Sequence, residues 1–233
     1  MKNLFFLTKR MPIFFLLCLI LQISFVNLNF YDAPTQIKSL PSPPSTTILE
    51  IMSMGDNISL SKILTLWLQN TDIQKGQFLS YDQLNYDKLT DWLTVILKQD
   101  PAAQYPLFLS SQLYTRVRSE AKQRQMLTFV YTQFLENPSE RWQWLAYATV
   151  LAKHRLHDLP LALQYASAIT DHATPTMPAW AQEMHIFILE DLEEWEQAQQ
   201  IIGGILAKGY ITDDNEISFL NEKLKQLSEN KNK

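Results

Sequence analysis

Cysteine and glycine are both scarce in this 233-residue chain, which has one cysteine, Cys18, and five glycines. A single cysteine excludes a disulfide within the chain and a metal site built from several thiolates. All-β folds need many glycine turns, so the shortage of glycine favours helices. The chain is otherwise 46% hydrophobic and 19% charged, which is typical of a globular protein.

Basic charge is in short supply after the N-terminus. Lys2, Lys9 and Arg10 are the only charged residues before Asp32. Residues 32–233 hold 17 basic and 24 acidic residues, a net charge of −7. A surface that binds phosphates needs an excess of lysine and arginine. We therefore do not expect nucleic acid among the partners.

Residues 12–30 carry no charge and form one largely apolar run. In a helix, about 19 residues span roughly 28 Å, close to the hydrocarbon core of a bilayer at about 30 Å. Basic residues precede the run, and the positive-inside bias places residues 1–11 in the cytoplasm. The pattern predicts a single-pass transmembrane signal-anchor over residues 12–30, with the remainder across the membrane.

A cleaved signal peptide is the alternative for this segment, since the basic start and apolar core fit one. However, the run is not followed by a good small-x-small cleavage site, because Ser24-Phe25-Val26 ends in a branched residue and Val26-Asn27-Leu28 has large residues at both ends. Leu17 precedes Cys18, so the small residue of a lipoprotein signal is missing too. These flanks favour an uncleaved anchor.

A proline-rich segment follows the apolar run. Residues 31–47 contain four prolines among many hydroxyl side chains. Proline is excluded from helix interiors, and such a stretch extends by about 3.1 Å per residue. We expect residues 31–58 to form a Pro/Ser-rich linker that includes a spacer of roughly 40–50 Å. A helical stripe then begins at Ser59, with apolar residues at 60, 63, 64, 67 and 68.

A period of 36 residues organises the expected domain, residues 59–209. A shift of 36 places Phe108 on Trp144 and Trp144 on Trp180, and likewise Ala162 on Ala198. Each period holds two helical stripes separated by breaks that contain proline. The first stripes start near Phe108, Trp144 and Trp180, and the second near Glu120, Leu159 and Trp195. A half repeat at 86–101 precedes them, and residues 210–233 are expected to be a capping helix and tail.

These residues resemble tetratricopeptide repeats, whose helix–turn–helix units recur about every 34 residues. The resemblance covers roughly residues 86–208. Its first-helix box is matched by Trp144, Tyr147, Ala148 and Leu151, and its second-helix positions by Ala162, Ala166 and Ile169. The family's first-helix glycine is replaced, and the units are two residues longer. The alternative is a generic α-helical domain whose 36-residue spacing is partly chance.

The resemblance implies an all-α fold: a short right-handed α-solenoid of antiparallel helix pairs behind the transmembrane helix and linker. The whole chain also looks similar to membrane-anchored, repeat-containing bacterial proteins of unassigned function. That similarity implies a place in the bacterial inner membrane, with the N-terminus in the cytoplasm and the C-terminal domain in the periplasm.

The stretch HRLHD offers two histidines, His154 and His157, three residues apart with Asp158 beside them. Such spacing can hold a metal ion on a helix. The period instead maps His154 and Asp158 onto Glu190 and Glu194, at the turn between paired helices. We therefore interpret the stretch as a turn, and we expect no metal and no cofactor.

Catalytic motifs are lacking in the sequence. It has no G-x-S-x-G elbow, and Gly203-Gly204 lies inside a helical stripe without a phosphate-loop context. We interpret the glycine pair as a point of close helix packing. A helical-domain enzyme, hydrolase or transglycosylase-like, remains the alternative, and it would need a cleft carboxylate such as Glu183 or Glu190.

The motif RWQW supplies the clearest candidate for binding. Trp142 and Trp144 point about 200° apart on a helix, so both cannot fill one core. In tetratricopeptide arrays the first helices line a groove, and tryptophan and arginine are common binding anchors. The resemblance therefore implies a partner-binding set on that side of the first helices: Arg116, Trp142, Thr149, Lys153 and His185. Trp142 packing against the preceding helix is the alternative.

The sequence thus predicts a membrane-anchored, non-catalytic scaffold or adaptor that binds a protein or peptide partner in a helical-repeat groove. The bilayer is the second expected partner, through residues 12–30. A structural protein whose solenoid self-associates is a further alternative.

Overall fold

The computed structural model describes residues 14–25, 39–70, 73–74, 77–78 and 80–230. They fall into two units. The first contains a helix at residues 14–25 and an antiparallel hairpin of β1 (Ile73–Gln74) and β2 (Gln77–Phe78), with Ile73 opposite Phe78. The second, the helical unit, contains residues 40–70 and 80–230.

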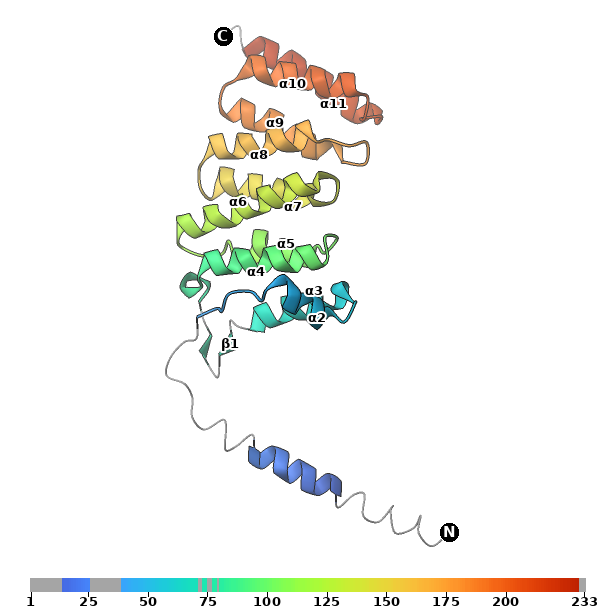
Figure 1. Ribbon diagram of the computed structural model, residues 1–233. Coiled ribbons are helices and arrows are strands. Elements are labelled where there is room, and N and C mark those ends of the chain that lie inside the picture. Colours follow the sequence, from blue (N-terminus) through green and yellow to red (C-terminus); the bar gives the residue numbers. More distant parts are fainter. Residues whose placement is uncertain (1–13, 26–38, 71–72, 75–76, 79, 231–233) are drawn as a thin grey trace. The chain divides into compact units, whose positions relative to one another are not determined.

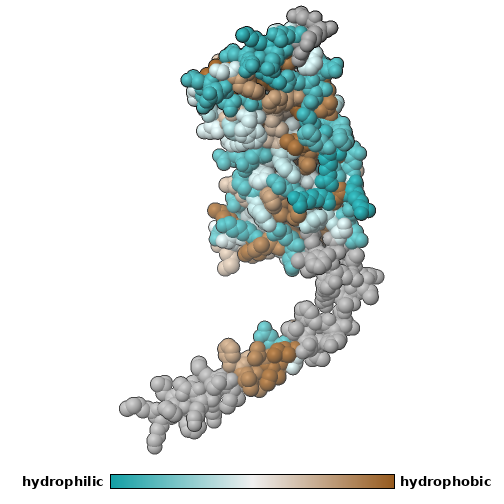
Figure 2. Space-filling model, turned by 180° about the vertical axis from the view of Figure 1, so that it is seen from behind, coloured by the Kyte–Doolittle hydropathy of each residue, from teal (hydrophilic) through white to brown (hydrophobic). Residues whose placement is uncertain are grey.

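The helix at 14–25 exposes apolar side chains around its surface, which is mostly brown in Figure 2. Within the part of the chain that the structure describes, no helix has both the length and the apolar character needed to cross a membrane. Of the predicted anchor at 12–30, residues 14–25 are helical, and residues 12–13 and 26–30 lie outside the described residues. Twelve helical residues extend about 18 Å.

The helical unit is built from helices packed in consecutive pairs and stacked from α2 at one end to α11 at the other (Figure 1). This confirms the all-α fold and is compatible with a helical repeat fold. The first helices of the pairs, called the first row, are α3 (Asn57–Asn70), α5 (Tyr105–Phe108) with the π-helical turn η2 (Leu109–Leu113), α7 (Pro138–His154) and α9 (Ala179–Asp191). The second row is α4 (Tyr86–Gln99), α6 (Glu120–Glu136), α8 (Leu159–Asp171) and α10 (Trp195–Lys208). The unit begins with α2 (Thr46–Ser53), includes the 3-10 turn η1 (Tyr81–Gln83), and ends with α11 (Asp214–Asn230).

Contacts between neighbouring helix pairs join residues 34 to 38 apart, close to the predicted 36-residue spacing. The Arg124 guanidinium bonds to Asp158, 34 residues on, and the Gln69 amide bonds to the Tyr105 hydroxyl, 36 residues on. Lys208 donates to the carbonyl of Thr170, 38 residues back. Each helix pair therefore contacts its neighbours along the stack, as in repeat proteins.

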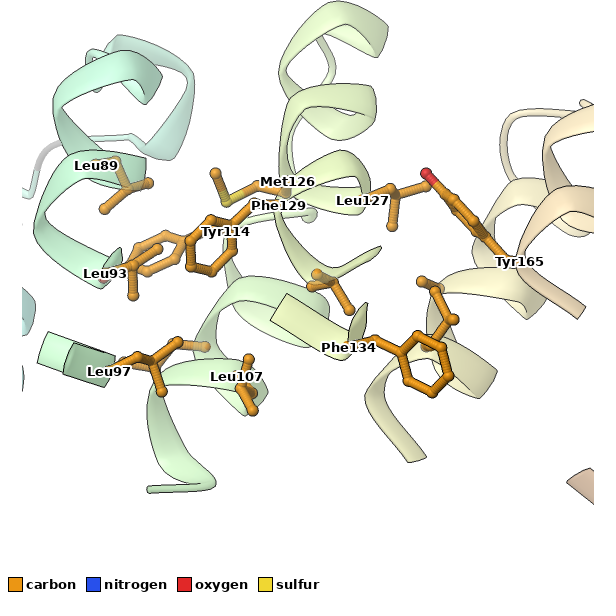
Figure 3. Packing of buried hydrophobic residues seen from close by; sticks show 14 of the residues in the cluster. Leu89, Leu93, Leu97, Leu107, Tyr114, Met126, Leu127, Phe129, Phe134 and Tyr165 are labelled. Carbon is orange, nitrogen blue, oxygen red and sulfur yellow. The ribbon is translucent and has the colours of Figure 1, made fainter. Parts of the chain in front are cut away.

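The core follows the seam between the two rows. Figure 3 shows Leu89, Leu93 and Leu97 of α4 facing Tyr114 and the apolar side chains of α6, with Tyr165 of α8 on the far side. The small residues predicted at second-helix positions are fully buried, since Ala162, Ala166 and Ala198 are each 0% exposed. Small side chains at these positions let the rows approach closely.

The packed part of the chain begins earlier than the predicted linker, 31–58, would allow. Leu40 and Leu49 are buried, and α2 occupies the second half of that segment. The Trp92 indole donates a 2.8 Å hydrogen bond to the carbonyl of Pro41, which fixes the prolines against α4. The segment from residue 40 onward is thus part of the core rather than a spacer.

The first-row helix near Phe108 is shorter than the other first-row helices. Its four α-helical residues continue as five π-helical ones. The hydroxyls of Ser110 and Ser111 donate to the carbonyls of Pro106 and Leu107 at 2.7 and 2.9 Å. Such side-chain bonds compete with the regular backbone ladder, which accounts for the irregular turn.

The interpretation of Gly203 and Gly204 as a close-packing point is wrong. Both are exposed on α10, and a Cβ atom added at either would meet no described atom within 4 Å. The buried face of α10 is formed instead by Ala198, Ile202 and Ile205.

Candidate partner-binding surface

A hollow of about 380 Å³ lies between the first-row helix α3 and the segment that leads into α5. Leu66, Ala103, Tyr105 and Pro106 supply most of its apolar lining. Leu66 is 64% exposed and Tyr105 48% exposed, so both present apolar surface to a ligand. Concave apolar surface with a few polar groups at its edge is typical of binding sites.

A row of aromatic side chains continues from this hollow along the N-terminal ends of the first-row helices. We call the following set the aromatic row: Tyr105, Phe108, Trp142, Trp144 and Trp180. Tyr105 stacks on Phe108 with ring centres 5.8 Å apart, and Phe108 meets Trp144 edge to face at 6.1 Å. Trp142 meets Trp180 of α9 at 5.4 Å. Trp180 is 50% exposed.

Polar groups hold the aromatic row in place. The Trp144 indole donates a 2.6 Å hydrogen bond to Oε1 of Gln104, and the Gln143 amide donates to the same atom at 3.2 Å. The Gln69 amide donates to the Tyr105 hydroxyl at 2.8 Å. Because these polar ends have partners within the chain, the rings are oriented before any ligand arrives, and less side-chain entropy is lost on binding.

A second hollow, of about 440 Å³, lies between the second-row helices α4 and α6. Threonines and glutamines dominate its lining, and the hydroxyls of Thr94 and Thr132 already donate to carbonyls of their own helices. It presents less exposed apolar surface than the first hollow and no row of rings.

Two of the predicted partner-binding residues lie near the surface. Arg116 is exposed in the loop between η2 and α6. Trp142 is half-buried and packs on Trp180 of the following repeat, while Trp144 packs on the preceding one. The expected divergence of the two tryptophans is therefore found, and Trp142 contacts the next first-row helix through the Trp180 ring.

The other three predicted residues do not form an exposed groove with them. Thr149 is 0% exposed, and its hydroxyl donates to the carbonyl of Leu145 inside α7. Lys153 is partly buried in an ion pair with Asp191 of α9. His185 is 6% exposed, and burial lowers its pKa. Thr149 and His185 thus face the interior. The helices α7 and α9 are buried on more than the one apolar stripe that the sequence indicates.

The HRLHD stretch is a turn, as predicted. His154 ends α7, and His157 takes a left-handed backbone conformation with φ 51°, matched 36 residues later by Glu193 with φ 59°. Asp158 caps α8 by accepting from the amide of Leu161 at 2.9 Å, and it also bonds to Arg124. That guanidinium holds the pKa of Asp158 below its usual value. No group of three or more metal-binding side chains gathers in the described chain.

The two carboxylates considered for catalysis have structural neighbours. Glu190 forms an ion pair with Lys223 of α11 at 2.9 Å. Glu183 is 6% exposed, and burial together with the nearby Glu216 carboxylate raises its pKa to about 7. Both hollows described above are lined by other residues. A raised pKa suits a general acid only where a substrate can reach the group.

Comparisons of the chain with protein-family models, with curated proteins and with solved structures find no match. The paired packing of helices is compatible with a helical repeat fold, and the tetratricopeptide resemblance stays a prediction. Function is therefore inferred from the hollow and the aromatic row.

Proposed function

We propose that the chain is a membrane-anchored, non-catalytic scaffold of the tetratricopeptide type, a right-handed solenoid that binds a protein or peptide partner. Residues 12–30 would anchor it in a bacterial inner membrane, with the N-terminus in the cytoplasm and the helical unit in the periplasm. The partner would lie along the hollow and the aromatic row.

The aromatic row, which begins at the apolar hollow and has an exposed ring at each end, is the observation that supports this proposal. Trp180 and Tyr105 stand at its ends with about half of their surface exposed. Aromatic side chains fixed in orientation are the usual anchors of protein interfaces.

The lining of the hollow indicates what the partner presents. Its charged residues are Lys62 and Asp100, one of each sign. We therefore do not expect the bound segment of the partner to be strongly charged. It suits an extended peptide or a short helix that offers two or three apolar side chains, the mode in which grooves of helical proteins bind peptides.

Photo-crosslinking in native membranes tests the proposal. A benzophenone amino acid replaces Tyr105 or Trp180 in the full chain, and the same replacement at Gln164, exposed on the second-row helix α8, serves as the control. We expect one and the same partner to be crosslinked from positions 105 and 180, and not from 164. Crosslinks from 164 alone, or different bystanders at 105 and 180, would contradict the proposal.

A further inference from the structure

The two ends of the helical unit differ in polarity. The last helix, α11, exposes charged and polar residues such as Glu222, Lys225 and Glu229, and Figure 2 shows a hydrophilic surface over the C-terminal helices. The end formed by α2 and the start of α3 exposes apolar residues instead: Ile48, Ile51, Met52, Met54 and Ile58 are between 48% and 93% exposed. A solenoid in water normally needs a polar outer face at each end.

Helix α2 has two apolar faces, of which the fold uses one. Leu49 and Ser53, four residues apart, face the core. Ile48, Ile51 and Met52 follow the i, i+3, i+4 spacing of a second stripe, and each is about half or more exposed. Among the residues that the structure describes, none covers this second stripe.

Met54 supports the same conclusion through its backbone. It is 93% exposed and sits at the end of α2 in the left-handed region, with φ 48°. Glycine or asparagine adopts this conformation at lower cost, and a large apolar side chain there is uncommon. Folding of the helical unit alone would favour another residue at position 54, so the exposed methionine points to a contact beyond the described part of this unit.

The covalent link between the proposed anchor and the helical unit keeps α2 close to the bilayer. Fourteen residues lie between the end of the apolar helix at 14–25 and Leu40, the first residue of the helical unit. Such a segment reaches at most about 50 Å even when fully extended. A bilayer that holds the anchor is therefore always within reach of α2.

The charges around the stripe also fit a lipid surface reached by apolar contact. Glu50, Asp56 and Lys62 are the charged residues between 46 and 63, a net charge of −1. A basic patch for anionic lipid is lacking in this segment. Attraction would come from inserted side chains, as in interfacial helices, and would change little with salt.

We propose that α2 and the α2–α3 turn are a membrane-contact face, on which Ile48, Ile51, Met52, Met54 and Ile58 enter the interfacial region of the bilayer. The inference rests on the membrane anchor of the proposed function. It adds that the α2 end of the helical unit rests on the bilayer, so that the aromatic row lies above the membrane surface.

The test uses the full chain in phosphatidylcholine vesicles, in a Cys18→Ser background. Met54→Cys carries an environment-sensitive fluorophore, and Lys225→Cys on α11 carries the same fluorophore as the control. We expect the emission from position 54 to shift to shorter wavelengths and to be largely quenched by lipids with spin labels in the acyl chain, at low and at high salt. The emission from position 225 should be that of a fluorophore in water and should not be quenched by these lipids.

The outcomes separate this inference from the anchor. If the chain floats with the vesicles while position 54 reports water, the contact face is wrong and the anchor stands. If the chain does not float, both are wrong. If position 54 reports an apolar environment that lipid quenchers do not reach, and the unlabelled Met54→Cys variant forms disulfides between chains, a second copy covers this face and the lipid assignment is overturned.

Discussion

At the scale of single residues, the role of the buried Arg141 side chain could not be predicted from the sequence. Arg141 is 2% exposed, and its guanidinium donates to the carbonyls of Gln133 and Pro101 at 2.8 and 3.0 Å. It thereby joins the α6–α7 turn to the α4–α5 turn, 40 residues back. In the motif RWQW the sequence draws attention to the tryptophans. The structural role of the arginine depends on carbonyl groups that are distant in the sequence and come together only in the fold.

Glu183 leads to a prediction about pH. Its pKa is raised to about 7, so the folded state binds a proton that the unfolded chain releases near its ordinary value of 4.5. Its stabilising effect is complete below pH 4.5 and is lost as the pH rises through 7. We expect Glu183→Gln to raise the free energy of unfolding at pH 8 by about 1–3 kcal/mol relative to wild type, and to do little at pH 4.5.

Urea unfolding across this range measures the effect, with Glu222→Gln on the exposed face of α11 as the control. His185 acts in the opposite direction, because burial lowers its pKa and its contribution is lost as the pH falls below about 6.5. The difference between wild type and Glu183→Gln isolates the glutamate. Parallel pH profiles for the two proteins would show that Glu183 is ionised in the fold.

At the scale of elements, helix positions were predictable where local signals set them. Asn85, Ser119 and Asp158 cap α4, α6 and α8 with their side chains, and such caps are visible in the sequence. The stripes also located α3, α9, α10 and α11. Helix α2 lies within the predicted linker, 31–58, because its buried face consists of only Leu49 and Ser53, which is too short a pattern to indicate a packed helix.

The exposed glycines of α10 lead to a prediction at this scale. Gly203 and Gly204 have helical backbones with open space around them, so alanine adds helix propensity without a clash. We expect each glycine-to-alanine change to raise the free energy of unfolding by about 0.5–1 kcal/mol. Gly209→Ala is the matched control and should destabilise, since Gly209 has φ 66°. Loss of stability in Gly203→Ala or Gly204→Ala, measured by urea unfolding, would contradict the open surface.

At the scale of the whole molecule, the paired packing of helices was predictable, and the candidate binding surface only partly so. The 36-residue shift aligned Phe108, Trp144 and Trp180, three members of the aromatic row, but as packing residues. Phe108 and Trp144 do pack against the core, but the 50% exposure of Trp180 could not be predicted, because it depends on how far each first-row helix is covered by the next. Thr149 was misplaced for the same reason.

The central claim is that the partner lies on the first row of helices. The most direct test is the dissociation constant of the crosslinked partner for the full chain in nanodiscs. A variant carrying Tyr105→Ser and Trp180→Ser is compared with the control Gln164→Ser and with wild type, all matched in helical circular dichroism. We predict binding at least about 30-fold weaker for the double variant, the loss typical of two interface anchors, and unchanged for the control. Equal affinity of the double variant and wild type would contradict the claim.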